Sequence, residues 1–122
     1  MQHDLPVETP PMHSAVISGT GLYQPPHTIT NAELVTAFNQ YADLHNQRFA
    51  AEIAAGTHTP MQHSSVEFIE KASGIRQRYV LEKTGVLDPL RMYPRFEERS
   101  DEQLSLMAEI AVSAAQQAMQ QA

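Results

Sequence analysis

Two arginines, Arg76 and Arg78, stand two residues apart in the stretch SVEFIEKASGIRQRYV, which spans residues 65–80. Side chains two residues apart on a β-strand lie on the same face, and a guanidinium binds phosphate and carboxylate groups through forked hydrogen bonds. One interpretation is therefore a contact to a phosphate or to an acidic carrier protein. The other is a salt bridge that holds the strand in place. We favour the salt bridge for Arg76 and keep both interpretations open for Arg78.

Other residues that could do chemistry are weaker candidates. Lys71 stands at the end of a predicted helix, where a cation is favoured by the helix dipole whether or not it binds a ligand. His58 and His63 have no cysteine or acidic residue between them, so we predict no metal site. The chain contains no cysteine, which excludes disulfides, thiolate metal sites and a cysteine nucleophile within these 122 residues.

The composition narrows the classes of function. A length of 122 residues is enough for one domain or a large part of one, and 42% of the residues are hydrophobic. The formal net charge of −6 argues against a general nucleic-acid binder, which needs a basic face. No apolar run approaches the roughly 18 residues that cross a bilayer, and the start of the chain does not resemble a secretory signal. We expect a cytoplasmic protein without nucleic-acid or membrane partners.

The first half of the chain is predicted to contain an arm, a strand and a helix. Residues 1–13 carry three prolines and form a flexible N-terminal arm. Residues 15–21 are rich in β-branched side chains and end at paired glycines, which is typical of a buried strand that leads into a turn. Thr30–Glu33 fits a capping box. The helix that follows has an apolar face made by Leu34, Ala37, Phe38 and Tyr41.

A long connection at residues 42–63 leads to a second helix. This helix is predicted to begin at a capping box in Ser64–Glu67 and to end near Gly74. Residues 75–81 alternate as in a strand, and another long connection occupies residues 82–99.

The last helix is predicted to run from Asp101 to the end of the chain, after a third capping box at Ser100. Its inner face consists of small and apolar side chains, namely Leu104, Met107, Ala108, Ala111, Ala115 and Ala118. Such a face lets another backbone approach closely, yet no partner of matching size is found in these residues. Two strands alone are not independently stable. We therefore predict the front of an α/β domain rather than a whole one.

Three segments together resemble the start of β-ketoacyl-acyl-carrier-protein synthase III, a condensing enzyme with the thiolase fold. They are ISGTGLYQPPHTITNAEL (17–34), EFIEKASGIRQRYV (67–80) and SDEQLSLMAEIAVSAAQQAMQ (100–120). In the family a strand ends in a G-T-G-x-Y-x-P turn, T-N-x-x-L starts a helix, and a second helix closes in T-G-I-R-x-R. The resemblance implies that residues 14–122 are the N-terminal part of a thiolase-like α/β/α/β/α fold.

The resemblance also implies which residues bind the substrate. Family members hold the adenine end of coenzyme A with a tryptophan and an arginine, and the matching positions here are Phe68 and Ala72. Phe68 keeps an aromatic face, and Lys71 supplies a cation beside Ala72. With Arg78, these form the predicted substrate-binding set of Phe68, Lys71 and Arg78. The two long connections exceed the usual length near the tunnel mouth, so we expect them to reshape access for bulkier acyl chains.

By the same resemblance, the whole enzyme condenses an acyl primer from acyl-CoA or acyl carrier protein with malonyl-carrier protein in fatty acid biosynthesis. Coenzyme A and phosphopantetheine thioesters are then substrates, and no resident cofactor or metal is expected. The family's cysteine, histidine and asparagine lie beyond this chain, so no catalytic residue is predicted within it. Expected partners are acyl carrier protein, acyl-CoA, a second copy in a homodimer, and the remainder of the enzyme on the same or a separate chain.

Two alternatives stay open. A family relative that makes another acyl-derived product would show the same opening motifs. A non-catalytic helical interaction module, which docks through the alanine-rich last helix, would also account for the missing nucleophile.

Overall fold

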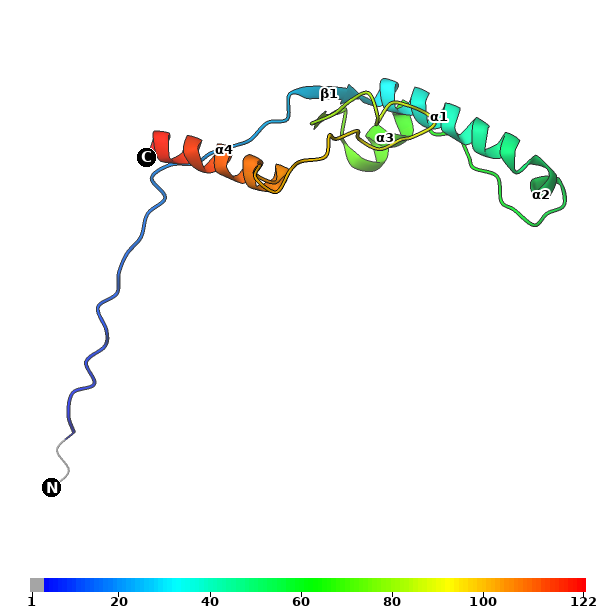
Figure 1. Ribbon diagram of the computed structural model, residues 1–122. Helices are drawn as coiled ribbons and strands as arrows, with labels where there is room; N and C mark the ends of the chain where they lie inside the picture. The colour runs from blue at the N-terminus through cyan, green and yellow to red at the C-terminus, as the bar shows by residue number, and fades with distance from the viewer. Residues whose placement is uncertain (1–3) are drawn as a thin grey trace. The chain divides into compact units, whose positions relative to one another are not determined.

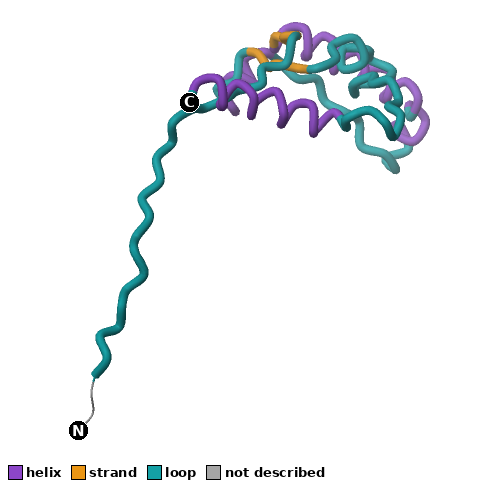
Figure 2. The backbone as a smooth tube through the Cα atoms, turned by 60° about the vertical axis from the view of Figure 1, so that its left-hand side comes forward, coloured by secondary structure: helices purple, strands orange, loops and turns teal. Residues whose placement is uncertain are grey.

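The computed structural model describes residues 4–122, which form two compact units (Figure 1). One unit comprises residues 24–104, and the other joins residues 4–23 to residues 105–122. Helices and a small sheet are present, so the mixed α/β class predicted from the sequence is confirmed (Figure 2).

The sheet of the larger unit has two short antiparallel strands, β1 (His27–Thr30) and β2 (Gln77–Val80). The register places Ile29 opposite Arg78. The strand predicted at residues 75–81 is therefore confirmed, although it is shorter at both ends. Its partner β1 follows two prolines, and the sequence pattern did not indicate a strand there.

Helix α1 (Asn31–Arg48) follows β1 directly, and its predicted capping box is confirmed. The Thr30 hydroxyl accepts a hydrogen bond from the backbone N–H of Glu33 at 3.2 Å, and the Glu33 carboxylate accepts one from the Thr30 backbone N–H at 2.9 Å. Helical structure continues into the predicted connection at residues 42–63. It runs first to Arg48 and then forms the short helix α2 (Ala50–Ala54).

Helix α3 (Val66–Ser73) begins one residue later than predicted, because Ser65 is the N-cap. The Ser65 hydroxyl accepts from the N–H of Phe68 at 3.1 Å. The backbone N–H of Ser64 instead donates to the side chain of Asn39. Gly74 ends the helix with φ of 71°, in the left-handed region that glycine enters without steric cost, as its predicted position implied.

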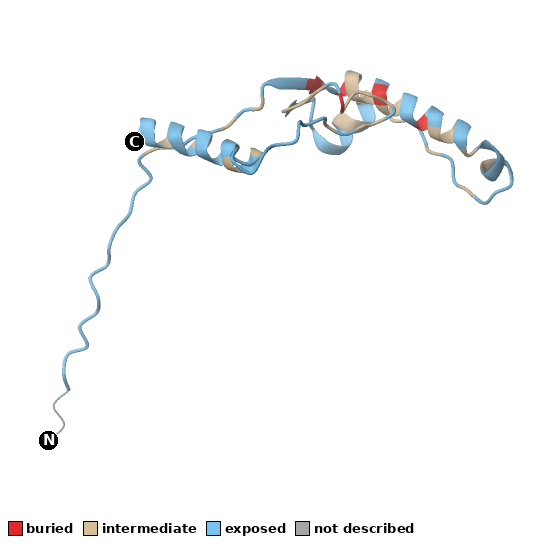
Figure 3. Cartoon of the chain, in the orientation of Figure 1, coloured by how far each residue is buried: buried red, intermediate tan, exposed pale blue. Residues whose placement is uncertain are grey.

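The larger unit buries few side chains (Figure 3). The buried apolar residues among those described are Ile29, Ala37 and Ala42, and the buried polar residue is Asn31. Large apolar side chains elsewhere stay exposed, including Leu90 at 81% and Phe68 at 66%. Hydrogen bonds, rather than an extensive apolar core, therefore position much of this unit.

In the smaller unit, the prediction of a strand at residues 15–21 is wrong. This segment is extended but pairs with no strand in the described part of the chain. Val16 and Ile17 are 87% and 88% exposed. A strand needs a neighbour to satisfy its backbone ladder. Here residues 19–22 lie along helix α4 (Leu106–Gln121), whose glutamine side chains accept from the backbone N–H groups of Thr20 and Leu22.

The start of α4 also differs from the prediction. Ser105 caps the helix by accepting from the N–H of Ala108 at 3.2 Å. The predicted cap at Ser100 is wrong, because Ser100 belongs to a separate turn closed by a bond from the Gln103 N–H to the Ser100 carbonyl. The partly buried row of the helix consists of Leu106, Ala108, Ile110, Ala114 and Ala118.

Two glycines allow the close approach of this segment to α4. A Cβ atom on Gly21 would lie 1.8 Å from the Ala114 carbonyl oxygen, and one on Gly19 would lie 2.2 Å from that of Ala118. A backbone therefore approaches small residues of α4 within this unit, although the sequence interpretation found no partner for the helix in these residues. Of the predicted face, Ala108 and Ala118 are partly buried, whereas Leu104, Met107, Ala111 and Ala115 are exposed.

Candidate functional site

The three predicted substrate-binding residues do not line one site. Phe68 projects from the first turn of α3 and, together with Phe38 and Ser65, lines a cavity of about 620 Å³. Neither Lys71 nor Arg78 is among the residues that line this cavity. An aromatic face beside an open cavity can stack on a flat ligand. The binding role of the set stays a prediction.

Lys71 lies in the last turn of α3 and is exposed. Arg78 is partly buried, and its Nη2 donates to Asn31 Oδ1 at 3.2 Å. Its Nη1 is buried without a hydrogen-bond partner within the described part of the chain. The guanidinium thus links β2 to the start of α1, and both N–H groups of Nη1 are unused within the described residues.

Asn31 is a positioning residue that the sequence interpretation missed. Its backbone N–H donates to the Arg76 carbonyl at 3.1 Å, and its Nδ2 donates to the Ile75 carbonyl at 2.7 Å. One buried amide therefore connects the start of α1 with the turn between α3 and β2. No signal in the sequence indicated this role, because the burial of Asn31, at 3% exposure, is seen only in the folded unit.

The salt bridge favoured for Arg76 is confirmed. Arg76 Nε donates to Glu70 Oε1 at 2.9 Å, which joins the residue after the turn to the last part of α3. The Arg76 side chain remains 82% exposed, so the pair orders the turn more than it stabilises the unit.

A row of polar side chains on α1 binds the returning loop. Asn39 pairs with Ser64, donating to its carbonyl at 3.1 Å and accepting from its N–H at 2.8 Å. Asn46 pairs with Met61 in the same way, at 3.0 and 2.9 Å. Each amide therefore satisfies both backbone groups of one loop residue, as a neighbouring strand would.

The spacing of these pairs follows from helix and strand geometry. Asn39 and Asn46 are seven residues apart, which is about 10.5 Å along a helix axis. Ser64 and Met61 are three residues apart, which is about 10 Å in extended chain. The loop therefore runs back along α1, and three of its residues cover the same distance as seven residues of the helix. The sequence signal for this arrangement is a pair of asparagines seven positions apart on one helix face.

Two histidine contacts support the same loop. His63 Nε2 lies 2.7 Å from Asp43 Oδ1, and the Nε2 atoms of His45 and His58 lie 2.8 Å apart. Within residues 4–122, no group of three or more histidine, cysteine, aspartate or glutamate side chains could hold a metal ion.

The connection after β2 is organised by the Glu82 carboxylate. It accepts backbone N–H bonds from Arg95 at 2.7 Å, Thr84 at 2.7 Å and Gly85 at 2.9 Å. These bonds, led by that from Arg95, lower the pKa of Glu82 from 4.5 to about 2, because each favours the charged form.

An ion pair fastens this connection to α1. Lys83 Nζ lies 2.7 Å from Glu33 Oε1. This bond and that from the Thr30 backbone lower the pKa of Glu33.

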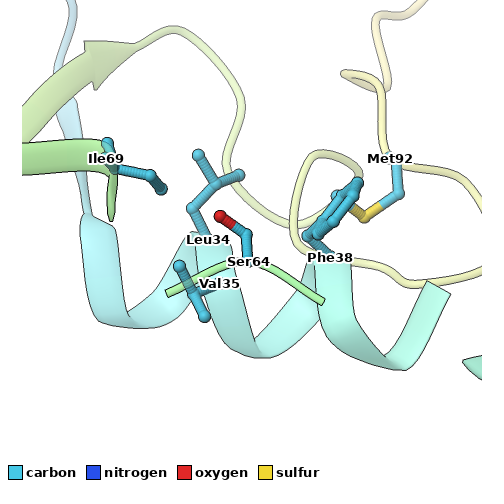
Figure 4. A pocket seen from close by; sticks show the side chains of 6 residues that line it. All are labelled: Leu34, Val35, Phe38, Ser64, Ile69 and Met92. Atoms are coloured by element: carbon cyan, nitrogen blue, oxygen red, sulfur yellow. The ribbon is translucent and has the colours of Figure 1, made fainter. Parts of the chain in front are cut away.

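A second cavity, of about 230 Å³, is lined almost entirely by apolar side chains (Figure 4). Leu34, Val35 and Phe38 come from α1, Ile69 comes from α3, and Met92 comes from the connection after β2. The sequence placed Leu34 and Phe38 on the apolar face of α1 and did not indicate a cavity. With no cysteine in the chain, the described sites supply no thiolate nucleophile.

Comparison with known proteins confirms the resemblance to the β-ketoacyl-acyl-carrier-protein synthases, although no family model matches the chain. One protein similar to this chain is a β-ketodecanoyl-[acyl-carrier-protein] synthase of Pseudomonas aeruginosa, which is 45% identical to it over 86 residues. The match covers 70% of this chain and 25% of the relative, so the chain spans about a quarter of that protein's length.

Among the described residues, no helix is both long and apolar enough to cross a membrane.

Proposed function

We propose that this chain is the N-terminal part of a β-ketoacyl-acyl-carrier-protein synthase III-like condensing enzyme. The identity of 45% over 86 residues to a β-ketodecanoyl-[acyl-carrier-protein] synthase is the observation that carries this proposal. The antiparallel β1–β2 pair and the exposed face of α4 fit a thiolase-like layering that the remainder of the enzyme completes.

In the proposed reaction, a cysteine thiolate outside this chain attacks the thioester of an acyl primer and releases the carrier thiol. Loss of carbon dioxide from malonyl-carrier protein then generates a carbanion at its α-carbon. This carbon attacks the acyl-cysteine, the new carbon–carbon bond forms, and the cysteine leaves as thiolate. A histidine and an asparagine, also outside this chain, assist the decarboxylation.

The substrates proposed are acyl-CoA or acyl-carrier protein and malonyl-carrier protein, with no resident cofactor. A ten-carbon β-ketoacyl product contains two carbons from the malonyl unit, so a primer of eight carbons is proposed for this enzyme. The proposed assembly is a cytoplasmic homodimer that binds acyl carrier protein. The name of the relative supports the carrier-protein partner and the product length.

Within this enzyme, the present chain would contribute the rim of the substrate entrance. Phe68 would contact the carrier end of the thioester from its cavity beside α3, and Lys71 and Arg78 would supply positive charge from outside that cavity. The exposure of Phe68, at 66%, supports a role in contact with a ligand rather than in the core.

The proposal is tested by assaying the enzyme that contains this chain with octanoyl-CoA and malonyl-carrier protein. We expect 3-ketodecanoyl-carrier protein and carbon dioxide, detected by mass spectrometry. Phe68→Ala should raise KM for octanoyl-CoA, whereas Phe96→Ala, at an exposed aromatic outside that cavity, should not. Absence of condensation with any acyl primer would refute the proposal.

The alternative of a helical interaction module is supported by exposed apolar side chains on α4, such as Met107 at 82%. It predicts that the 122-residue chain unfolds cooperatively by itself and binds a partner through α4. A requirement for the remaining polypeptide in order to fold would exclude this alternative.

A further inference from the structure

The cavity of about 230 Å³ lies where α1, α3 and the connection after β2 pack against each other. Every residue that lines it is partly buried, and none of these side chains is charged. They are Leu34, Val35, Phe38, Ser64, Ile69 and Met92 (Figure 4). The cavity is therefore apolar, with one hydroxyl group.

Hydrogen bonds of the protein itself hold two walls of this cavity. The Met92 N–H donates to the Asp88 carbonyl at 2.8 Å, which closes the turn that carries Met92. Met92 has φ of 56°, a conformation that is uncommon for a non-glycine residue and concentrates at sites that clamp ligands. On the loop before α3, Asn39 binds both backbone groups of Ser64, at 3.1 and 2.8 Å.

The Ser64 hydroxyl is the polar side-chain group of the cavity. It has no hydrogen-bond partner among the described residues, whereas the backbone groups of Ser64 are bound by Asn39. A water molecule in a cavity needs about two to four polar partners, and the lining side chains offer this one hydroxyl. Water is therefore held poorly here, and an apolar molecule that displaces it gains affinity.

The size of the cavity indicates the size of the ligand. An apolar cavity of about 150 Å³ in a protein admits benzene, so in proportion about 230 Å³ admits roughly nine heavy atoms. A charged group would lose its hydration here without a partner of opposite charge. We propose that this cavity binds an uncharged medium-chain aliphatic molecule with one oxygen, such as an eight-carbon alcohol. Its chain contacts Leu34, Ile69 and Met92, and its oxygen is hydrogen-bonded to Ser64.

This site goes beyond the proposed condensation, since it needs neither a cysteine nor a carrier protein. Its ligand is a free molecule rather than a thioester. A protein that condenses acyl primers but binds no alcohol in this cavity would refute the site alone. One that binds the alcohol without condensing would refute the proposed function alone.

The first test is calorimetric titration of the purified protein with hexan-1-ol, octan-1-ol and decan-1-ol. Octan-1-ol should bind about tenfold more tightly than hexan-1-ol, because two more methylene groups are buried. Decan-1-ol should gain little more, because the cavity is already full. Octanoate and octylammonium should each bind at least about tenfold more weakly than octan-1-ol.

Three results would overturn the proposal. They are affinity that rises equally through decan-1-ol, octanoate that binds as tightly as octan-1-ol, and no binding of any of the alcohols. The last result is also expected if another polypeptide segment fills the cavity.

The second test locates the ligand by NMR. Nuclear Overhauser contacts should join the octan-1-ol chain to the methyl groups of Met92 and Ile69. Met107 and Met119, which are 82% and 69% exposed on α4, are the control methyl groups. Contacts to these two alone would show adsorption to an exposed apolar surface and would overturn the proposal.

Variants separate the two parts of the site. Ser64→Ala keeps the backbone bonds to Asn39, so it should weaken octan-1-ol about threefold to tenfold and leave the dependence on chain length unchanged. Met92→Gly suits the positive φ, so the backbone is preserved while a wall is lost, and the dependence on chain length should flatten. Ser113→Ala, at an exposed serine of α4, is the matched control. A Ser64→Ala protein that binds octan-1-ol as the unmodified protein does would contradict the assignment of the oxygen.

Discussion

The loop at residues 57–64 and the extended segment at residues 19–22 each lie against a helix, but different groups hold them. On α1, asparagine side chains bind both backbone groups of Met61 and Ser64. On α4, the backbone of the segment approaches the helix backbone because Gly19 and Gly21 have no Cβ atom. The first arrangement depends on the presence of polar groups, and the second depends on the absence of methyl groups.

The two regions also differ in how much apolar surface they leave exposed. In the loop on α1, both backbone groups of Met61 and of Ser64 are bound within its own unit. The segment on α4 has two N–H groups bound by glutamine side chains, while its β-branched side chains at Val16 and Ile17 stay exposed. The second region is therefore the place where additional chain would bury apolar surface.

The largest effect is expected for Gly21→Val. The new side chain would meet the Ala114 carbonyl oxygen, since even a Cβ atom would lie 1.8 Å away. The segment must leave α4 or distort it, and overpacking of this kind costs about 1–3 kcal/mol. We expect the amide of Leu22 to lose its protection in hydrogen exchange. Protection equal to that of the unmodified protein would show that the segment does not contact α4.

The control for this variant is Gly56→Val. Nothing lies within 4 Å of a Cβ atom at Gly56, but its φ is +76°. The cost should come from the backbone conformation alone, at about 1–2 kcal/mol, and the amide of Leu22 should remain protected.

A loss of similar size is expected for Asn46→Ala. It leaves the N–H and carbonyl of Met61 without partners, at a cost of about 1–3 kcal/mol in the free energy of unfolding if water does not replace them. Hydrogen exchange at the Met61 amide should speed up while that of the Ser64 amide changes less. Gln47→Ala, at an exposed neighbour on the same helix, is the matched control.

Lowering the pH tests whether the Glu82 carboxylate binds backbone N–H groups in the connection after β2, as the asparagine side chains bind the loop on α1. The pKa of Glu82 is lowered to about 2, so its stabilising contribution is complete above pH 4.5 and is lost as the pH falls toward 2. The carboxyl carbon signal of Glu82, followed by NMR, should titrate near pH 2. A midpoint near 4.5 would mean that the N–H groups of Arg95 and Gly85 do not bind it. Glu82→Gln should remove this pH dependence.

The smallest effect is expected for Arg76→Gln. Because the Arg76 side chain is 82% exposed, loss of its bond to Glu70 should cost no more than about 1 kcal/mol. Urea unfolding measures this difference. A loss of several kcal/mol would show that the pair is shielded from solvent in the assembled protein.

Local signals in the sequence predicted the larger unit well. The capping box at Thr30, the left-handed glycine at Gly74 and the Arg76 salt bridge depend on residues close together in the chain. The pairing of β1 with β2 joins residues about 50 positions apart, and no local pattern indicated it. The strand at residues 15–21 was predicted from its composition, but composition cannot supply the neighbouring strand that forms a ladder.

The candidate site was predicted less well for a similar reason. Residue types identified Phe68 as an aromatic contact, yet the cavity beside it also depends on Gln62 and Ser65, which the folded loop brings near. Arg78 was left open, and its bond to Asn31 arises because β2 lies beside the start of α1. Cavities depend on how distant elements pack, so the sequence gives their lining residues only after the packing is known.

The matched rise of α1 and its returning loop has a consequence for how this region can change in length. Seven helical residues advance about as far as three extended ones. An insertion that adds seven residues to the helix and three to the return, ten in all, would bring one more asparagine pair into register. Insertions of other sizes would shift the pairing partners, so related proteins are expected to differ here in steps of ten residues.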